Sequence, residues 1–136
     1  MIHEELSGEI TPNAFGVEVL NELKPGLDEE LYERAMLIEL KHRGHTVSAQ
    51  SSFPVSYRGE LTGDLIPDLI VDDAVVVDPK VVSGFTDSHI AQMIGYLNIT
   101  RLDLALLINF KNAHLEWKRV LRPQEIDERN NPDLHA

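Results

Sequence analysis

Two short apolar runs joined by a pair of aspartates constrain this fold more than any other part of the sequence. Strand-like patterns cover residues 61–71 and 74–80, and the Asp72-Asp73 pair between them suits a tight hairpin. With that turn, residues whose numbers sum to about 145 face each other, so Asp68 is expected opposite Val77 and next to Asp78. Lys80 lies two residues beyond Asp78 and should project from the same side of the strand.

Both aspartates are embedded in apolar strand sequence, where a carboxylate is costly unless it is paired or binds a metal. Asp68 and Asp78 would also repel each other if they share a face of the hairpin. Two interpretations follow. In the first, Lys80 neutralises one of them in a salt bridge. In the second, a divalent cation relieves the repulsion, and Mg²⁺ prefers such oxygen ligands.

Two helices are predicted before the strands, over residues 11–24 and 28–43. The first opens with a threonine and a proline, and the second has acidic residues in its first turn and basic residues in its last. In the second helix, Glu39 lies four residues after Ala35 and eight after Leu31, on the side expected to be apolar. A glutamate there also needs a partner.

The remaining pattern predicts a strand region over residues 45–57, a helix beginning at Thr86-Asp87, and strands over 104–110 and 115–121. The order helix, helix, three strands, helix, two strands predicts an α/β sandwich around a mixed sheet. Residues 1–121 are expected to form one domain. Residues 122–136 are expected to form a polar tail with a short helix at most.

Composition excludes several functions. Twelve basic and 23 acidic residues give a net charge of −11, which disfavours broad electrostatic capture of nucleic acid. The absence of cysteine removes disulfides and thiolate nucleophiles, and the six histidines form no HxxxH or HExxH pair that would indicate zinc. No apolar run approaches the roughly 18 residues of a membrane span, and the acidic start is unlike a targeting peptide. We therefore expect a cytoplasmic protein without a membrane partner.

Pro67-Asp68 followed by Asp78-Pro79-Lys80 has the form of the PD-(D/E)xK nuclease signature. Upstream, residues 18–33 (EVLNELKPGLDEELYE) resemble the hallmark of the GxxExxY proteins, a branch of that superfamily, and Glu39-Leu40 continues the pattern. Downstream, residues 89–92 (HIAQ) and 106–110 (LLINF) resemble the following helix and the closing strand of the branch. The resemblance covers roughly residues 9–121, most of the chain.

The resemblance implies a restriction-endonuclease-like αβββαβ core, with a mixed central sheet flanked by helices. It also implies a nuclease that hydrolyses phosphodiester bonds of DNA or RNA through water activated by Mg²⁺ or Mn²⁺. The catalytic residues carried over are Glu39, Asp68, Asp78, Lys80 and Gln92. The metal ligands would be Asp68, Asp78, Glu39 and the carbonyl of Pro79. Lys80 would position and activate the water, and Gln92 would orient the water or Lys80.

The sequence departs from the family pattern at the site itself. Ile66-Pro67 stands where arginine and alanine are usual, and Asp78-Pro79-Lys80 replaces glutamate, an aliphatic residue and lysine. Aspartate is one carbon shorter than glutamate, which would shift or weaken a bound metal. Pro79 has no N–H to donate, so this point of the strand is predicted to be an edge, an end or a bulge.

Three functions stay open: a metal-dependent nuclease, a catalytically weakened nuclease-fold module that binds a nucleic-acid or protein partner, and a structural protein whose acidic cluster is salt-bridged. Divalent binding separates the first two from the third, and cleavage separates the first from the second. Given the charge, nucleic acid is expected to bind weakly or to use a homodimer, a basic protein partner or a small basic strip. The residues of that strip would be Lys111, Lys118, Arg119 and Arg122.

Overall fold

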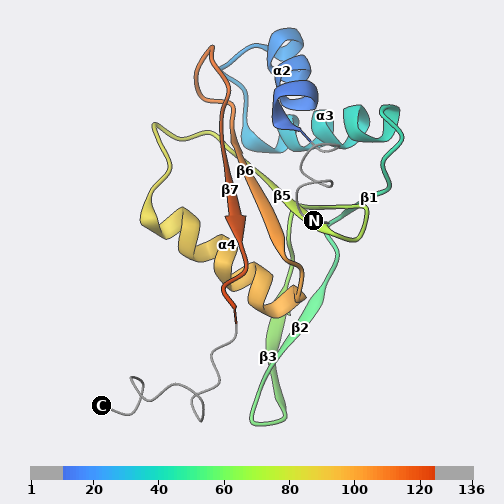
Figure 1. Ribbon diagram of the computed structural model, residues 1–136, viewed down its shortest axis with the longest axis vertical. Helices are drawn as coiled ribbons and strands as arrows, with labels where there is room; N and C mark the ends of the chain where they lie inside the picture. The colour runs from blue at the N-terminus through green and yellow to red at the C-terminus, as the bar shows by residue number, and fades with distance from the viewer. Residues whose placement is uncertain (1–10, 125–136) are drawn as a thin grey trace.

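The computed structural model describes residues 11–124 and contains one five-stranded mixed sheet with helices on both faces (Figure 1). The sheet order is β1-β4-β5-β6-β7, and β2 and β3 form a separate hairpin. The helices are α2 (Pro12–Leu23), α3 (Glu29–His42) and α4 (Asp87–Thr100). The strands are β1 (Val47–Ala49), β2 (Phe53–Tyr57), β3 (Glu60–Leu65), β4 (Leu69–Val71), β5 (Val75–Lys80), β6 (Leu104–Asn109) and β7 (Glu116–Leu121). The predicted α/β class, with a mixed central sheet flanked by helices, is confirmed.

Strand β5 lies at the centre of the sheet and combines both pairing directions. It pairs antiparallel with β4 through a turn that contains Ala74 as well as the predicted Asp72 and Asp73, and both aspartates adopt left-handed conformations (φ 55° and 53°). It pairs parallel with β6, and α4 supplies the crossover that a parallel pair requires. β6 then pairs antiparallel with β7.

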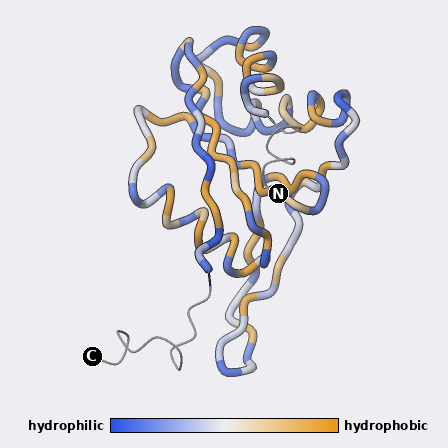
Figure 2. Tube along the Cα trace, in the orientation of Figure 1, coloured by the Kyte–Doolittle hydropathy of each residue, from blue (hydrophilic) through white to orange (hydrophobic). Residues whose placement is uncertain are grey.

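The side chains of β5 alternate between two apolar cores. Val75 and Val77 pack with α2 and α3 on one face, whereas Val76 packs with Met93 and Leu97 of α4 on the other. This alternation is the usual consequence of a strand buried on both faces. Figure 2 shows the hydrophobic stretches concentrated along the central strands.

The helix boundaries follow the signals in the sequence. Thr11 precedes α2 with Pro12 in its first turn, and Asp28 precedes α3. Thr86 caps α4 through a capping box, in which the Thr86 side chain accepts from the N–H of His89 and His89 Nδ1 accepts from the N–H of Thr86. None of the described helices has the length and apolar character needed to cross a membrane.

Two predicted strands each divide in the structure. The pattern over residues 45–57 gives β1 and β2, separated near Gln50, whose φ is 58°. The pattern over residues 61–71 gives β3 and β4, separated around Pro67, which cannot donate to a ladder. Five strands therefore lie between α3 and α4, where three were predicted.

The β2–β3 hairpin extends away from the main sheet (Figure 1). Pro54 is tolerated in β2 because this two-stranded ribbon leaves one edge of each strand unpaired. The ribbon contains an irregularity between Val55 and Ser56, beside which Thr62 Oγ1 donates to the Val55 carbonyl at 2.8 Å. At the base of the hairpin the chain returns to β4 through Asp68.

The predicted polar tail lies mostly outside the described residues, as does the short helix expected within it. Its first residue, Arg122, is tied to the end of the sheet. The Arg122 N–H donates to the carbonyl of Asp103 at 2.9 Å, and its guanidinium forms an ion pair with the Asp103 carboxylate at 2.8 Å.

Candidate active site at the end of β5

Asp68 and Asp78 meet where β4 begins and β5 continues past it. The last pair of the β4–β5 ladder is Leu69 with Val77, so one further step brings Asp68 opposite Asp78. The predicted placement of Asp68 opposite Val77 is therefore wrong by one residue. The predicted convergence of the two carboxylates needs no bulge with this register.

The backbone around Pro79 explains why proline is tolerated there. β4 ends its pairing at Val77, while β5 continues to pair with β6 as far as Lys80. The Lys80 carbonyl accepts from the N–H of Phe110 at 2.9 Å, so by alternation the backbone of Pro79 points to the opposite side, where β4 has ended. The missing N–H thus costs no ladder bond, and the Pro79 carbonyl is directed toward the open side.

Lys80 links the strand carboxylates to α4. Its Nζ lies 2.8 Å from Asp78 Oδ2 in an ion pair and donates to Gln92 Oε1 at 3.2 Å. Gln92 Nε2 in turn donates to the hydroxyl of Tyr96 at 3.3 Å. The structure thus brings four of the five predicted catalytic residues together: Asp68, Asp78, Lys80 and Gln92. It adds Tyr96, one helical turn beyond Gln92.

The electrostatics of this group follow from burial and close charges. Asp78 is only 3% exposed, and burial followed by the proximity of Asp68 raises its pKa to about 8 even though Lys80 opposes the rise. Burial alone would lower the pKa of Lys80, but Asp78 outweighs it and the pKa lies above its usual value. Burial and the two aspartates also raise the pKa of Tyr96.

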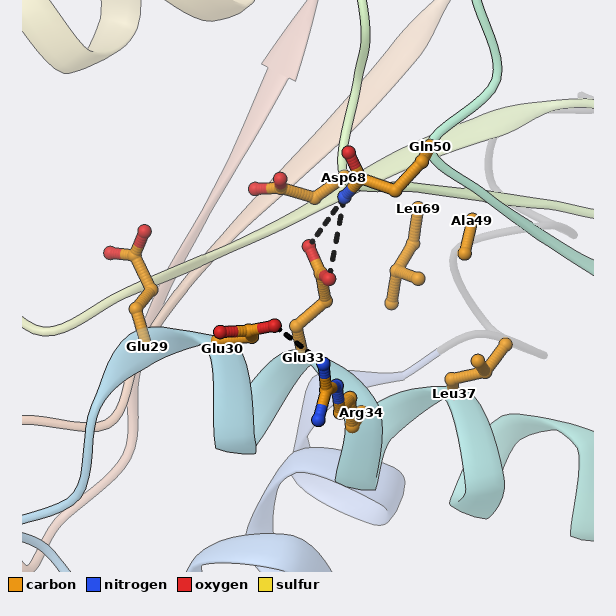
Figure 3. Close-up of a pocket in the computed structure, with 9 residues that line it drawn as sticks. All are labelled: Glu29, Glu30, Glu33, Arg34, Leu37, Ala49, Gln50, Asp68 and Leu69. Carbon is orange, nitrogen blue, oxygen red and sulfur yellow. Dashed lines mark hydrogen bonds and ion pairs between the residues drawn. The ribbon is translucent and has the colours of Figure 1, made fainter.

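Helix α3 contributes a different glutamate from the one predicted. A cavity of about 430 Å³ lies between α3 and the start of β4, and its lining includes Glu29, Glu33, Gln50 and Asp68 (Figure 3). Glu33 points toward Gln50 and Asp68, and Gln50 Nε2 donates to both of its carboxylate oxygens at 3.4 Å. Burial, and then Asp68, raise the pKa of Glu33 to about 7.

Glu39 lies elsewhere, so its predicted position beside the strand carboxylates is wrong. Its carboxylate forms an ion pair with Arg43 at 2.6 Å, and it lines a second cavity together with residues of α2. At 3.6 residues per turn, the separation of six positions from Glu33 to Glu39 turns the side chain to a different face of α3. Glu29 and Glu33 are four apart and share a face. The GxxExxY-like segment contains both of them, as Glu29 and as the second residue of the Tyr32-Glu33 pair, and this segment was the signal that could have identified them.

Tyr32 fixes the start of α3 and therefore the position of its glutamates. The ring is fully buried and stacks on Phe110, with the ring centroids 4.6 Å apart. Its hydroxyl donates to the carbonyl of Lys24 at 2.6 Å and accepts from the N–H of Leu27 at 3.2 Å. The connection between α2 and α3 is thereby held against the core, with Glu33 directed into the cavity.

The possible metal ligands at the end of β5 are carboxylate and carbonyl oxygens, the type of ligand that a hard divalent cation prefers. Asp78 Oδ2 is buried and, although it is paired with Lys80, forms no aligned hydrogen bond with any described residue. Within residues 11–124 no three His, Cys, Asp or Glu side chains are grouped closely enough to enclose an ion. The available ligands are therefore the two aspartates and the Pro79 carbonyl, a small set of the kind that Mg²⁺ completes with water.

The predicted basic strip is not one continuous face. Lys118 and Arg119 are consecutive in β7 and project to opposite sides of the sheet. Arg122 is engaged by Asp103. Four of the nine residues that line the larger cavity are instead acidic, and Arg34, the only base among the nine, is paired with Glu30 at 2.6 Å.

A mixed sheet with α3 and α4 on opposite faces, and with two aspartates and a lysine at the end of its central strand, defines a restriction-endonuclease-like α/β protein. A family model described as the PD-(D/E)XK nuclease superfamily matches residues 4–120, and the chain belongs to this superfamily. Comparisons with curated proteins and with solved structures gave no match.

Proposed function

We propose that this protein is a metal-dependent nuclease of the GxxExxY branch, which hydrolyses phosphodiester bonds of DNA or RNA with Mg²⁺ or Mn²⁺. The observation that carries the proposal is the meeting of Asp68, Asp78 and Lys80 at the end of β5. Membership of the PD-(D/E)XK nuclease superfamily supports nuclease chemistry at that position.

In this proposal the cation is held by the carboxylates of Asp68 and Asp78 and by the Pro79 carbonyl. When bound, the cation supplies Lewis-acid stabilisation and lowers the pKa of water. Glu33 takes the place predicted for Glu39 as the carboxylate from the helix, because it borders the same cavity as Asp68. Burial and then the neighbouring Asp68 raise its pKa, and a cation between the two carboxylates would offset the contribution of Asp68.

Lys80 and Gln92 act beside the carboxylates. Without substrate, Lys80 Nζ lies 2.8 Å from Asp78 Oδ2, and a phosphate oxygen could take the place of Asp78 as the partner of the ammonium group. Gln92 Oε1 accepts from Lys80 Nζ and restricts where the ammonium group lies. Tyr96 accepts from the Gln92 amide and so orients the amide oxygen toward Lys80.

The first test is calorimetric binding of Mn²⁺ and Mg²⁺ to the wild type, to Asp68→Ala and to Asp64→Ala. Asp64 is an exposed residue of the β2–β3 hairpin, so its replacement removes the same charge away from the site. We expect the wild type and Asp64→Ala to bind and Asp68→Ala to lose binding. Absence of binding by the wild type at millimolar metal would mean that the acidic cluster is neutralised internally, and the enzyme proposal would be abandoned.

The second test is cleavage. Supercoiled plasmid, circular single-stranded DNA and single-stranded RNA are incubated with the protein and Mn²⁺, and Lys80→Ala is the matched variant. We expect wild-type cleavage of one of these substrates and a loss of about 100-fold or more in Lys80→Ala, the scale on which charge stabilisation at a reacting group operates. Equal residual cleavage by both proteins would indicate a contaminating nuclease.

A second candidate function is a nuclease-fold module that binds a partner without turnover. The ion pair between Lys80 and Asp78 and the net charge of −11 favour it, because both work against the approach of a phosphate backbone. Metal binding that depends on Asp68, with no cleavage of any of the three substrates, would favour this module over the enzyme.

A further inference from the structure

The outer side of the α2–α3 pair carries an apolar groove that the nuclease proposal does not use. A cavity of about 190 Å³ lies there, and its apolar lining is Val19, Leu23, Ala35 and Ile38. Ile38 is 70% exposed, which is unusual for a large aliphatic side chain in the middle of a helix.

This apolar lining continues along α3 as a stripe. Leu31, Ala35 and Ile38 recur at spacings of four and three, so they lie on one side of the helix, and Leu31 is 44% exposed. The buried side of α3 is formed by other residues, namely Tyr32, Met36 and Leu40. Leu31 and Ile38 therefore lie outside the core, against which Ala35 packs only in part, and an exposed stripe with this spacing is a surface onto which another helix can pack.

The charge around the groove identifies the chemistry of the partner. The side chains that line it include Glu18, Glu22 and Glu39 but no basic residue. Glu39 is already paired with Arg43, whereas neither Glu18 nor Glu22 forms an ion pair with a described residue. Glu18 and Glu22 are also four residues apart on α2, a spacing at which like charges repel.

A second copy of this chain would not relieve that repulsion. In a two-fold symmetric contact the same glutamates would approach each other, and each protomer carries a net charge of −11. Residues 1–10 carry three glutamates and one histidine, so their charge does not complement the groove either. A partner with lysines or arginines beside its apolar residues complements both the apolar lining of the groove and the glutamates around it.

We infer that the α2–α3 groove docks a basic amphipathic helix of a partner protein. Its apolar residues pack on Leu31 and Ile38, and its basic residues pair with Glu18 and Glu22. The groove is separate from the carboxylate site, because α3 presents Glu33 to the one and Ile38 to the other.

The test uses a synthetic helical peptide of leucine and lysine, with leucines at positions i, i+3, i+4 and i+7, and a control peptide in which glutamate replaces each lysine. Binding is measured by fluorescence anisotropy in 0.15 M salt, and the contact is located by amide chemical shifts. We expect the lysine peptide to bind with shifts confined to α2 and α3, and the glutamate peptide not to bind. Glu22→Lys and Ile38→Ser should each weaken binding about tenfold.

Glu60→Lys, at an exposed position of the β2–β3 hairpin, makes the same charge change away from the groove and should alter the affinity less than about twofold. An equal loss in Glu60→Lys and Glu22→Lys would show that only net charge matters and would overturn the inference. Concentration-dependent dimerisation that Ile38→Ser abolishes would assign the groove to a second copy instead. Absence of peptide binding by the wild type would also overturn it. Ile38 is exposed, so its replacement by serine should leave the fold intact, which circular dichroism checks.

Discussion

Replacing Asp78 by asparagine should make the metal-free protein more stable at alkaline pH while changing it little at acidic pH. Asp78 is buried beside Asp68, and its pKa of about 8 lies far above the ordinary value of 3.8. The folded protein therefore keeps a proton on this group between about pH 4 and pH 8, whereas the unfolded chain releases it. Over that range the contribution of Asp78 to folding stability falls as the pH rises, and above pH 8 it stays at its lowest level.

The magnitude follows from the width of that range. For each pH unit over which the unfolded chain has lost this proton and the folded protein has kept it, the free energy of unfolding falls by about 1.4 kcal/mol. From pH 5 to pH 8 this gives at most about 4 kcal/mol. Movement of the carboxylate toward water, together with its ion pair to Lys80, should reduce the measured change to about 2 kcal/mol. Asparagine has nearly the same shape and does not titrate, so Asp78→Asn should lack this decline.

The assay is urea unfolding at pH 5 and pH 9 in the presence of EDTA, followed by far-ultraviolet circular dichroism. Glu33, whose pKa is also raised, titrates in both proteins, so the comparison of wild type with Asp78→Asn isolates Asp78. The stability of Asp78→Asn relative to wild type should rise by about 2 kcal/mol between the two pH values. A difference that is the same at pH 5 and pH 9 would refute the argument, because it would mean that Asp78 is ionised in the folded protein throughout.

Three further predictions concern α3 and the β4–β5 turn. Tyr32→Phe keeps the stacked ring but removes two hydrogen bonds to the α2–α3 connection, and it should cost about 1–3 kcal/mol in urea unfolding at pH 7; no change would mean that water replaces both bonds. Burial would raise the pKa of Asp72, but its contacts with His45 (2.7 Å) and with the Thr46 N–H outweigh burial and lower it; Asp72→Asn should cost about 1 kcal/mol at pH 6, a cost that disappears as the pH falls through this lowered pKa and the wild-type carboxylate is protonated. Glu33→Gln should weaken Mn²⁺ binding about tenfold in calorimetry, whereas Glu39→Gln, the same change on another face of α3, should leave it unaltered; the opposite result would restore the role first predicted for Glu39.

The helices could be predicted almost to the residue because their boundaries depend on local signals. Thr86 at the start of α4, Pro12 in the first turn of α2 and the acidic first turn of α3 each act within one helical turn of their own position. The strand breaks could not be predicted in the same way. The predicted strand over residues 61–71 is continuous although Pro67 interrupts its apolar pattern, and the structure separates the hairpin strand β3 from β4 in the main sheet at that point.

The strand half of the candidate site was predictable because a short turn leaves little freedom in the register. The predicted pairing was one residue out because the turn between Val71 and Val75 contains three residues, Asp72 to Ala74, rather than the predicted two, and this brings Asp68 directly opposite Asp78. Lys80 follows from strand alternation alone. What the pattern could not supply was the contact of Lys80 with Gln92, because that contact depends on how α4 crosses the sheet.

Glu39 could not be placed from the sequence because α3 has two apolar sides, and only one of them faces the core. Tyr32 and Met36 are fully buried, whereas the stripe that includes Ile38 borders the groove shared with α2 and stays exposed. Hydrophobic periodicity detects both sides and cannot distinguish a core contact from a docking surface. The glutamate beside the exposed stripe therefore belongs to the groove, and Glu33 on the remaining face is the one directed toward the strand carboxylates. The face of α3 that carries Ile38 is apolar, has acidic neighbours and is not covered by the core of this chain. These are the properties expected of a surface that docks a basic partner.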